Sequence, residues 1–252
     1  QLMIISLEDP KDTTIDLIAN HLLLNSDNNI SLINDYFSSE QKLFILRYAD
    51  ASNLKNDILN NKEWIIKELK NNDFQKIQSY SSKSGLNKEI VSMIDSIFSI
   101  SMNIQKDYQV IKRSDNDKYL WIGRGYPYRW ILIYEDDHIH YNNSERAWSR
   151  IENKTNKILD IDIIPYERQL EKININNKEV KKLYGVFGTK IDSKNPTGGP
   201  FVSYIFEPLK SNSVLIAIGF VNFPGKNKVF HIKELEYIIE TIKLDERIMI
   251  YE

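Results

Sequence analysis

The sequence predicts an α+β protein, with a largely antiparallel sheet or sheets and helices packed on one face. Glycine and proline are unevenly distributed, since residues 1–122 contain only Gly85 and Pro10 and residues 123–252 contain all the others. Because these residue types mark turns, the first part favours helices with simple connections and the second a turn-rich sheet. Closely spaced strand-like runs with few long crossovers in the second part favour antiparallel pairing under a layer of helices.

The first part of the chain is expected to contain short strands and three helices. Two apolar runs are typical of buried strands: residues 2–5 and 42–48. Asp12 can cap a first helix, which carries Ile15 and Leu22 on one face. Hydrophobic periodicity predicts two further helices, at residues 62–70 and 86–103.

The second part is expected to hold a series of strands with two helices. Strand-like runs lie at residues 119–122, 130–134, 169–175, 180–187, 200–207 and 213–222. Ser144 can cap a helix at 145–158 that buries Trp148. A closing helix at 230–243 carries an apolar stripe, and Glu234 is among the residues expected outside that stripe.

A domain boundary is expected after the helix at 86–103. It divides the chain into an N-terminal α+β half, residues 1–107, and a C-terminal α+β half, residues 108–252, which contains a GGPFVS motif. The same segment would also serve as a connection inside one continuous domain. Both halves follow a coarse order of strand, helix and further strands, so two similar halves are an open alternative.

Composition excludes several classes of function. The net charge is −2 and the isoelectric point about 6.2, so the chain lacks the basic surface field of nucleic-acid-binding proteins. The absence of cysteine excludes disulfides, thiolate metal sites and a cysteine nucleophile. No apolar run reaches the roughly 18 residues that a membrane-spanning helix needs.

Asp136, His138 and His140 form the best candidate for a metal site. Two histidines at i and i+2 point to the same face of an extended chain, and the carboxylate adds oxygen ligands. A third ligand such as His231 would complete a site for zinc or another divalent ion, and with it a metal-dependent hydrolase. The alternative is a polar strand end that turns into a loop.

Other catalytic motifs are poorly represented. The chain has no G-x-S-x-G elbow, and Ser203 lies in a predicted strand. Residues 123–125 and 197–200 contain paired glycines but lack the remainder of a dinucleotide fingerprint or a P-loop. No catalytic residue and no cofactor is therefore predicted. Gly198 and Gly199 instead indicate a tight turn or a close approach of two backbones.

Aromatic residues crowd into residues 119–134 and suggest a binding surface. Exposed rings there would stack on sugar rings or anchor a protein partner, whereas rings covered by the helix at 145–158 would be core. The candidate ligand-binding or partner-binding residues are Trp121, Arg124, Tyr126, Tyr128, Trp130, Gly198, Gly199 and Phe201. Arg129 is the second charged residue beside this cluster.

The last third of the chain resembles a family of Bacteroidota envelope lipoproteins, the domain of unknown function numbered 4837. The resemblance rests on YGVF at 184–187, GGPFVS at 198–203, GFVNFP at 219–224 and KELE at 233–236. The strand-like YLWIGR at 119–124 and the opening residues 2–6 are similar to the family's strands as well. Tyr184 stands where the family pattern has arginine, Asn222 where it has tyrosine, and Gly123 interrupts a strand motif.

The resemblance implies a lipoprotein of the cell envelope, anchored to the outer membrane on its periplasmic or its outer side. Its lipidated cysteine would lie upstream of Gln1, and the absence of an initiator methionine is what we expect of a processed chain. The membrane would be contacted only through that anchor. The leading hypothesis is a non-enzymatic binding or accessory module with an envelope protein partner. The alternatives are the metal-dependent hydrolase and a carbohydrate-binding module whose aromatic residues stack on a glycan.

Overall fold

The computed structural model of the protein describes residues 2–7, 17–18, 20–22, 29–38, 41–189, 197–210 and 212–244. Two compact units are present, residues 1–79 and residues 80–252, and the division falls within one long helix. The division does not coincide with the predicted boundary at residue 107. The reason is that the helix and strand before residue 107 belong to the core of the second unit.

The first unit is built on a three-stranded sheet with the order β1-β3-β2. Its strands are β1 (Leu2–Leu7), β2 (Ile30–Asn34) and β3 (Lys42–Tyr48), and β3 pairs parallel with β1 and antiparallel with β2. Helices α2 (Ala51–Asn60) and α3 (Lys62–Ser84) follow. Central β3 is almost wholly buried because it has apolar contacts on both faces, with Leu43 and Ile45 on one and Phe44 and Leu46 on the other.

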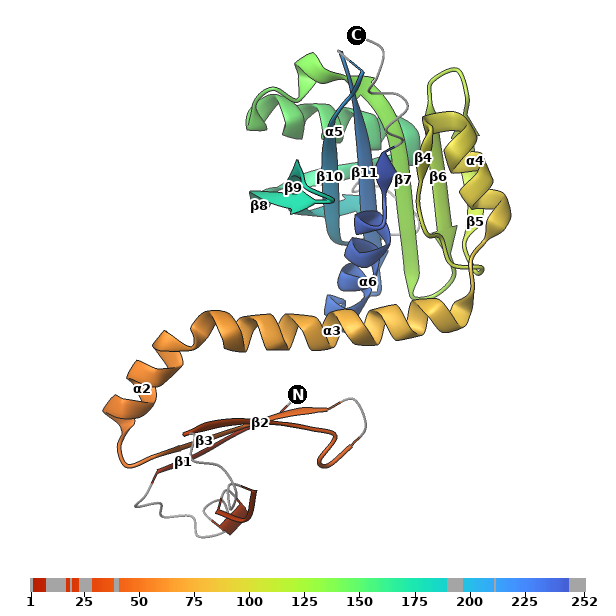
Figure 1. The fold of residues 1–252 in the computed structure, drawn as a ribbon. Helices are drawn as coiled ribbons and strands as arrows, with labels where there is room; N and C mark the ends of the chain where they lie inside the picture. Colours follow the sequence, from red (N-terminus) through yellow and green to blue (C-terminus); the bar gives the residue numbers. More distant parts are fainter. Residues whose placement is uncertain are drawn as a thin grey trace. The chain divides into compact units, whose positions relative to one another are not determined.

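The second unit is built on a seven-stranded antiparallel sheet, with the order β5-β6-β7-β11-β10-β9-β8 (Figure 1). Its strands are β5 (Gln109–Ser114), β6 (Tyr119–Arg124), β7 (Tyr128–Asp137), β8 (Ile161–Ile175), β9 (Lys178–Thr189), β10 (Gly198–Lys210) and β11 (Ser213–Asn222). Short strands β4 (Ile100–Ser101) and β12 (Lys243–Leu244) pair separately. The helical elements are α4 (Lys88–Phe98), the 3-10 turn η1 (His138–His140), α5 (Ser144–Leu159) and α6 (Val229–Glu240).

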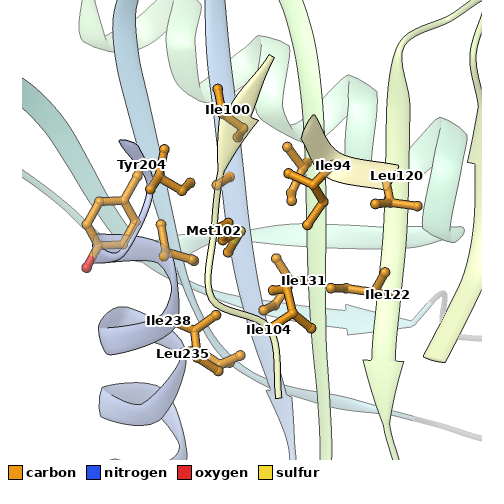
Figure 2. Packing of buried hydrophobic residues seen from close by; sticks show 14 of the residues in the cluster. Ile94, Ile100, Met102, Ile104, Leu120, Ile122, Ile131, Tyr204, Leu235 and Ile238 are labelled. Atoms are coloured by element: carbon orange, nitrogen blue, oxygen red, sulfur yellow. The ribbon is translucent and has the colours of Figure 1, made fainter. Parts of the chain in front are cut away.

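Helices cover both faces of the seven-stranded sheet, not one face as the sequence predicted. Alternate residues of each strand point to opposite faces, and both sets are apolar in the central strands. One face packs against α4 and α6, through side chains such as Ile94 and Leu235 (Figure 2). The other face packs against α5, through Trp148 and Ile151. The central strands are therefore near-continuous apolar runs, which leave no solvent-facing side to recognise in the sequence.

The predicted α+β class and the antiparallel sheet are confirmed, whereas several element bounds differ. Residues 17–18 and 20–22 are helical, and the proposed cap Asp12 lies outside the described residues. The helix at 62–70 extends to Ser84, and the helix predicted to reach 103 ends at Phe98. Ser99 adopts a left-handed conformation, with φ 55°, and starts the turn into β4. The two units have different sheet topologies, so they are not two similar halves.

Gly199 lies where two strand backbones approach closely. A Cβ atom on this residue would lie 2.0 Å from the carbonyl oxygen of Val221, closer than any real contact. Gly198 is also crowded, since a Cβ there would lie 3.0 Å from the carbonyl oxygen of Phe187. The glycines of the GGPFVS motif are therefore explained by the packing of β9, β10 and β11.

Candidate functional site

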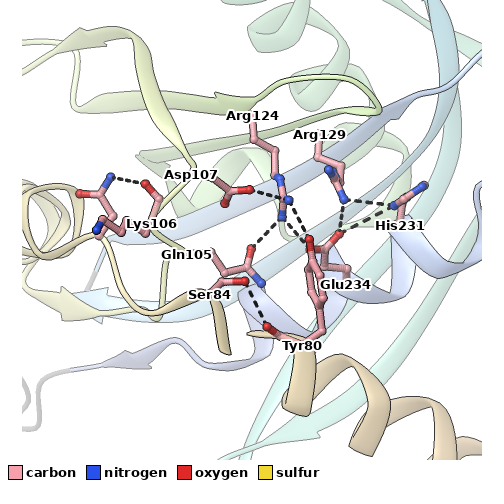
Figure 3. A network of polar contacts seen from close by, with 10 residues as sticks. Tyr80, Ser84, Gln105, Lys106, Asp107, Arg124, Arg129, His231 and Glu234 are labelled. Carbon is pink, nitrogen blue, oxygen red and sulfur yellow. Dashed lines mark hydrogen bonds and ion pairs between the residues drawn. The ribbon is translucent and has the colours of Figure 1, made fainter. Parts of the chain in front are cut away.

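Two arginines of the second unit share one buried carboxylate. Arg124 ends β6 and Arg129 lies near the start of β7, so the turn between these strands separates them. Nη1 of Arg124 donates to Oε1 of Glu234 at 2.9 Å, and Nη1 of Arg129 donates to Oε2 at 2.7 Å (Figure 3). The Glu234 side chain, on α6, is fully buried. Each carboxylate oxygen thus accepts a hydrogen bond from one guanidinium, and the second negative charge that the two arginines need comes from Asp107, which pairs with Arg124.

Arg124 also contacts residues from the segments that precede the sheet. Its Nη2 lies 2.5 Å from a carboxylate oxygen of Asp107 and donates to the hydroxyl of Tyr80 at 3.1 Å. Its Nη1 donates to the amide oxygen of Gln105 at 3.4 Å. Burial would lower the Arg124 pKa, but the hydrogen bond with Tyr80 and the charges of Glu234 and Asp107 outweigh it and leave the pKa raised. Arg124 therefore carries a permanent charge and joins three segments of the chain through hydrogen bonds and ion pairs.

His231 lies at the edge of this network, one helical turn before Glu234. Its Nδ1 lies 3.2 Å from Nη1 of Arg129 and 3.8 Å from Oε2 of Glu234. Burial and the positive charge of Arg129 lower the pKa of the imidazole, against the opposing effect of Glu234. Because a guanidinium only donates, the contact with Arg129 requires a neutral ring with Nδ1 as acceptor.

Six rings form a continuous series of contacts that reaches the arginines through His231 and Tyr80: Tyr128, Tyr126, Phe223, His231, Phe230 and Tyr80. The successive centroid distances are 5.7, 5.1, 5.4, 5.6 and 6.4 Å, and all five pairs meet edge to face. Four of the rings are exposed, from 40% for Tyr80 to 62% for Tyr126. We call these four exposed residues, Tyr80, Tyr126, Tyr128 and Phe230, the aromatic surface.

The predicted aromatic row divides into an exposed part and a packed part. Tyr126 and Tyr128 are exposed, as a binding role requires. Trp121 and Trp130 are half-buried, meet edge to face at 6.1 Å and pack against the core cluster beneath α5. Gly123 makes this packing possible, because a Cβ there would lie 2.7 Å from the Trp130 ring. The tryptophans thus serve mainly as packing, with only part of each ring accessible.

The remaining predicted partner-binding residues are core or strand-packing residues. Phe201 is 1% exposed and packs between Trp148 and Phe220, so it is a core residue. Gly198 and Gly199 are half-buried in β10. Ser203, also in β10, is fully buried. Of the predicted set, Tyr126 and Tyr128 come together beside Arg124, and the half-buried Trp130 adjoins Tyr128, with their ring centroids 6.4 Å apart.

The predicted metal ligands do not have the predicted geometry. His138 and His140 lie in the 3-10 turn η1 and not on an extended chain, so the i, i+2 argument is wrong here. Asp136 accepts hydrogen bonds from Nε and Nη2 of Arg150 at 2.6 and 2.8 Å. His231 is engaged with Arg129. The described part of the chain contains no group of three His, Asp or Glu residues that could hold a metal ion.

Sequence reasoning missed six residues of this site: Tyr80, Gln105, Asp107, Phe223, Phe230 and Glu234. Glu234 was expected outside the buried stripe of its helix, but it is fully buried because two arginines pair with it. One signal was present, since Phe230 and Glu234 are four residues apart and therefore share a helix face. Nothing in the sequence linked that face to Arg124 and Arg129.

Comparisons with known proteins give a family but no activity. No curated protein matches the chain. The solved structure of the Saccharomyces cerevisiae Ran-binding protein Mog1p is 8% identical, with 59% of this chain and 92% of that chain covered and a TM-score of 0.39. A point mutant of the protein Mog1 is 7% identical, with 57% and 90% covered and a TM-score of 0.37. With TM-scores below 0.5, these likenesses support no inference about this chain.

A membrane-spanning helix is not found in the described ranges, where no helix is both long and apolar enough. The model of one protein family, the domain of unknown function DUF4837, matches residues 87–241. The match covers α4 to α6, and with them the whole seven-stranded sheet and most residues of the arginine network. Since the matched residues are more than half of the chain, the protein belongs to the DUF4837 family.

Proposed function

We propose that the protein is a non-enzymatic binding module of the cell envelope that binds a partner protein through the aromatic surface. The observation that carries the proposal is the exposure of four aromatic rings, Tyr80, Tyr126, Tyr128 and Phe230, within one series of ring contacts. Aromatic side chains offer a large contact area at a small entropic cost and are enriched at the centres of protein interfaces.

The buried network beneath the rings supports a preorganised surface. Arg124 and Arg129 flank the turn that carries Tyr126, and both pair with Glu234 on the helix that carries Phe230. Arg124 also donates a hydrogen bond to the hydroxyl of Tyr80. The three segments that supply the exposed rings are therefore held together by one charged cluster. Preorganisation of this kind reduces the entropy lost on binding.

A protein partner is favoured over a glycan by the orientation of the rings. Tyr126 lies at 82° to Tyr128 and at 77° to Phe223, so neighbouring rings cover part of each other's faces. Stacking on a sugar needs a flat, accessible ring face, whereas a protein side chain can insert between ring edges. Trp121 and Trp130, which the carbohydrate hypothesis used, are half-buried.

The envelope location is part of the proposal and rests on the sequence motifs. GGPFVS at 198–203 and GFVNFP at 219–224 are the segments that resemble envelope lipoproteins. We propose that the protein is lipid-anchored. Metabolic labelling of the full-length protein with an alkynyl fatty acid, followed by membrane fractionation, tests this point. A protein that is unlabelled and absent from the membrane fraction would contradict it.

Site-specific photo-crosslinking tests the binding surface. A benzophenone amino acid at Tyr126 is compared with the same group at Tyr166, which is 76% exposed on β8 and outside the aromatic surface. We expect one protein to crosslink in cells from position 126 and not from position 166. Crosslinking of the same proteins from both positions would contradict a specific surface.

The double variant Tyr126→Ala, Phe230→Ala gives an independent test, with Tyr166→Ala as its control. The double variant also loses ring contacts with Tyr128, Phe223, Tyr80 and His231, so binding is measured at a temperature at which circular dichroism shows both variants folded. The purified partner found by crosslinking should bind the double variant at least tenfold more weakly and Tyr166→Ala with unchanged affinity. Binding of a glycan panel, lost in the double variant, would instead favour the carbohydrate hypothesis.

A further inference from the structure

A separate pocket of about 400 Å³ lies on α5 and the 3-10 turn η1, outside the aromatic surface. It is lined by Ile139, His140, Arg146, Ser149, Arg150 and Asn153. Five of these six side chains carry hydrogen-bonding groups, and two of them carry a permanent positive charge. We call this site the α5 pocket.

The spacing of the helix residues explains how they meet. Arg146, Ser149, Arg150 and Asn153 stand at i, i+3, i+4 and i+7, so they form one stripe along α5. The opposite stripe of the helix, with Trp148 and Ile151, is buried against the sheet. The backbone that carries the polar stripe is therefore fixed by the core.

The two arginines differ in what they contact. Arg150 is held by a two-pronged contact with Asp136, which fixes the position of its guanidinium at the wall of the pocket. Within the described ranges, the Arg146 guanidinium makes no ion pair and no hydrogen bond. Its full set of donors is therefore available to a ligand.

The donors favour a phosphate group. The Arg146 guanidinium, the Ser149 hydroxyl and the Asn153 amide can each donate hydrogen bonds, and all three belong to one stripe of the helix. A phosphate monoester presents several oxygens and up to two negative charges, so it matches a set of this size better than a carboxylate does. The volume exceeds that of a phosphate ion, and exposed Ile139 adds an apolar wall for an organic moiety.

We propose that the α5 pocket binds the phosphate monoester group of a phosphorylated small molecule or lipid headgroup. Arg146 is the principal contact, Ser149 and Asn153 donate hydrogen bonds, and Arg150, neutralised by Asp136, forms the wall. The site is independent of the aromatic surface, and neither proposal requires the other.

Isothermal titration calorimetry of the whole chain, with amide chemical shifts recorded in parallel, tests the proposal. The probes are inorganic phosphate and glycerol 3-phosphate at constant ionic strength. We expect glycerol 3-phosphate to bind more tightly, because its hydroxyls can also form hydrogen bonds with the polar lining of the pocket. The absence of heat and of shift changes in α5 with both probes at millimolar concentrations would overturn the proposal.

A matched pair of variants separates a specific site from general attraction to positive charge. Arg146→Gln and Lys157→Gln each remove one positive charge from α5, and Lys157 is exposed near the end of the helix, outside the pocket. Loss of a charged hydrogen-bond donor should weaken glycerol 3-phosphate binding about tenfold or more in Arg146→Gln. Lys157→Gln should leave it within about twofold. Equal losses in the two variants would overturn the proposal.

Vesicles identify the source of the phosphate group. Phosphatidic acid carries a phosphate monoester at the membrane surface, and phosphatidylcholine vesicles serve as the neutral control. Arg146-dependent binding to phosphatidic acid vesicles would assign a lipid headgroup. Arg146-dependent binding of glycerol 3-phosphate without vesicle binding would assign a soluble ligand.

Discussion

Arg129 donates a hydrogen bond from Nη1 to Oε2 of Glu234 at 2.7 Å, with both side chains buried. The contact joins the start of β7 to α6, 105 residues later in the sequence. Since solvent does not screen it, the loss of either partner leaves an uncompensated charge inside the protein.

Glu234→Gln should destabilise the second unit strongly. The substitution keeps the shape of the side chain but leaves Arg124 and Arg129 without their common carboxylate. We expect a loss of about 3–5 kcal/mol in the free energy of unfolding, measured by urea denaturation. Glu179→Gln is the control, because Glu179 lies in an exposed ion pair with Lys172 and its substitution should change the stability little. An equal effect of the two substitutions would contradict the importance of the buried network.

His231 should titrate below the ordinary histidine range. Burial and Arg129 lower its pKa in the folded protein, whereas the unfolded chain takes up the proton near pH 6.5. The contribution of His231 to stability is therefore fully present above about pH 6.5 and decreases as the pH falls toward the folded pKa. Proton NMR of the imidazole measures the titration directly, and a midpoint at or above 6.5 would contradict the assignment.

The same argument predicts a difference between the wild type and His231→Gln. Between about pH 7.5 and pH 5.5 the wild type should lose more stability than the variant, because only the wild type has the depressed imidazole. Urea denaturation at the two pH values measures both losses. Identical losses would show that His231 does not contribute to the pH dependence.

Gly199→Ala should be much more damaging than Gly125→Ala. A Cβ at 199 would collide with the carbonyl oxygen of Val221, whereas a Cβ at 125 would meet nothing within 4 Å. We expect Gly199→Ala to cost about 2 kcal/mol or more, because strand backbone must move, and Gly125→Ala to change stability by less than about 1 kcal/mol. Thermal unfolding measures both. A tolerated Gly199→Ala would exclude the close backbone approach as the reason for the glycine.

Asp136→Asn should destabilise the protein. Metal ions should not change the melting temperature of the wild-type protein. Burial tends to raise the pKa of Asp136, but the hydrogen bonds from Arg150 and the charge of Lys154 outweigh it and leave the pKa lowered. The carboxylate therefore stabilises the fold above the unfolded pKa of about 3.9, and this contribution is lost as the pH falls through the folded value.

We expect Asp136→Asn to cost about 1–3 kcal/mol at neutral pH. The Asp136 carboxylate already accepts two hydrogen bonds from Arg150. Zinc added to chelator-treated wild-type protein should therefore leave its melting temperature unchanged. A zinc-dependent rise that disappears in Asp136→Asn would instead support the metal site predicted from the sequence.

The elements that the sequence predicted well are those with a strong local pattern. The strand at Lys42–Tyr48 and the strand at Ser213–Asn222 were predicted with their observed bounds, because each is a continuous apolar run. Strand β5 was missed because nearly all its residues are exposed at the edge of the sheet. Helix α2 was missed because its apolar stripe is short, with only Leu54 and Ile58 packed against the core and no residue fully buried. Hydrophobic patterns in the sequence indicate which residues are buried, so elements with few buried residues are hard to predict from them.

The candidate site was only partly predictable for a different reason. Tyr126 and Tyr128 were identified because aromatic residues cluster in the sequence between two strands. Their partners Phe230 and Glu234 come from a helix that follows β11, and only the pairing of β7 with β11 brings that helix near. A single sequence gives the residues of each segment but not the long-range strand order that juxtaposes them.

The pairing of β7 with β11 also has a consequence for the kinetics of folding. Strands β5 to β7 form one block of sequential neighbours and strands β8 to β11 form another, so each block can assemble through short loops. The two blocks meet where β7 pairs with β11, and this pairing begins at Asp137 and Ser213. It requires closure of a much longer loop than any pairing within a block. The pairing of β7 with β11 is thus the step of sheet assembly with the largest entropic cost. During synthesis, the edge of β7 stays unpaired until β11 has been made. We expect aggregation of incompletely synthesised chains to begin at this edge.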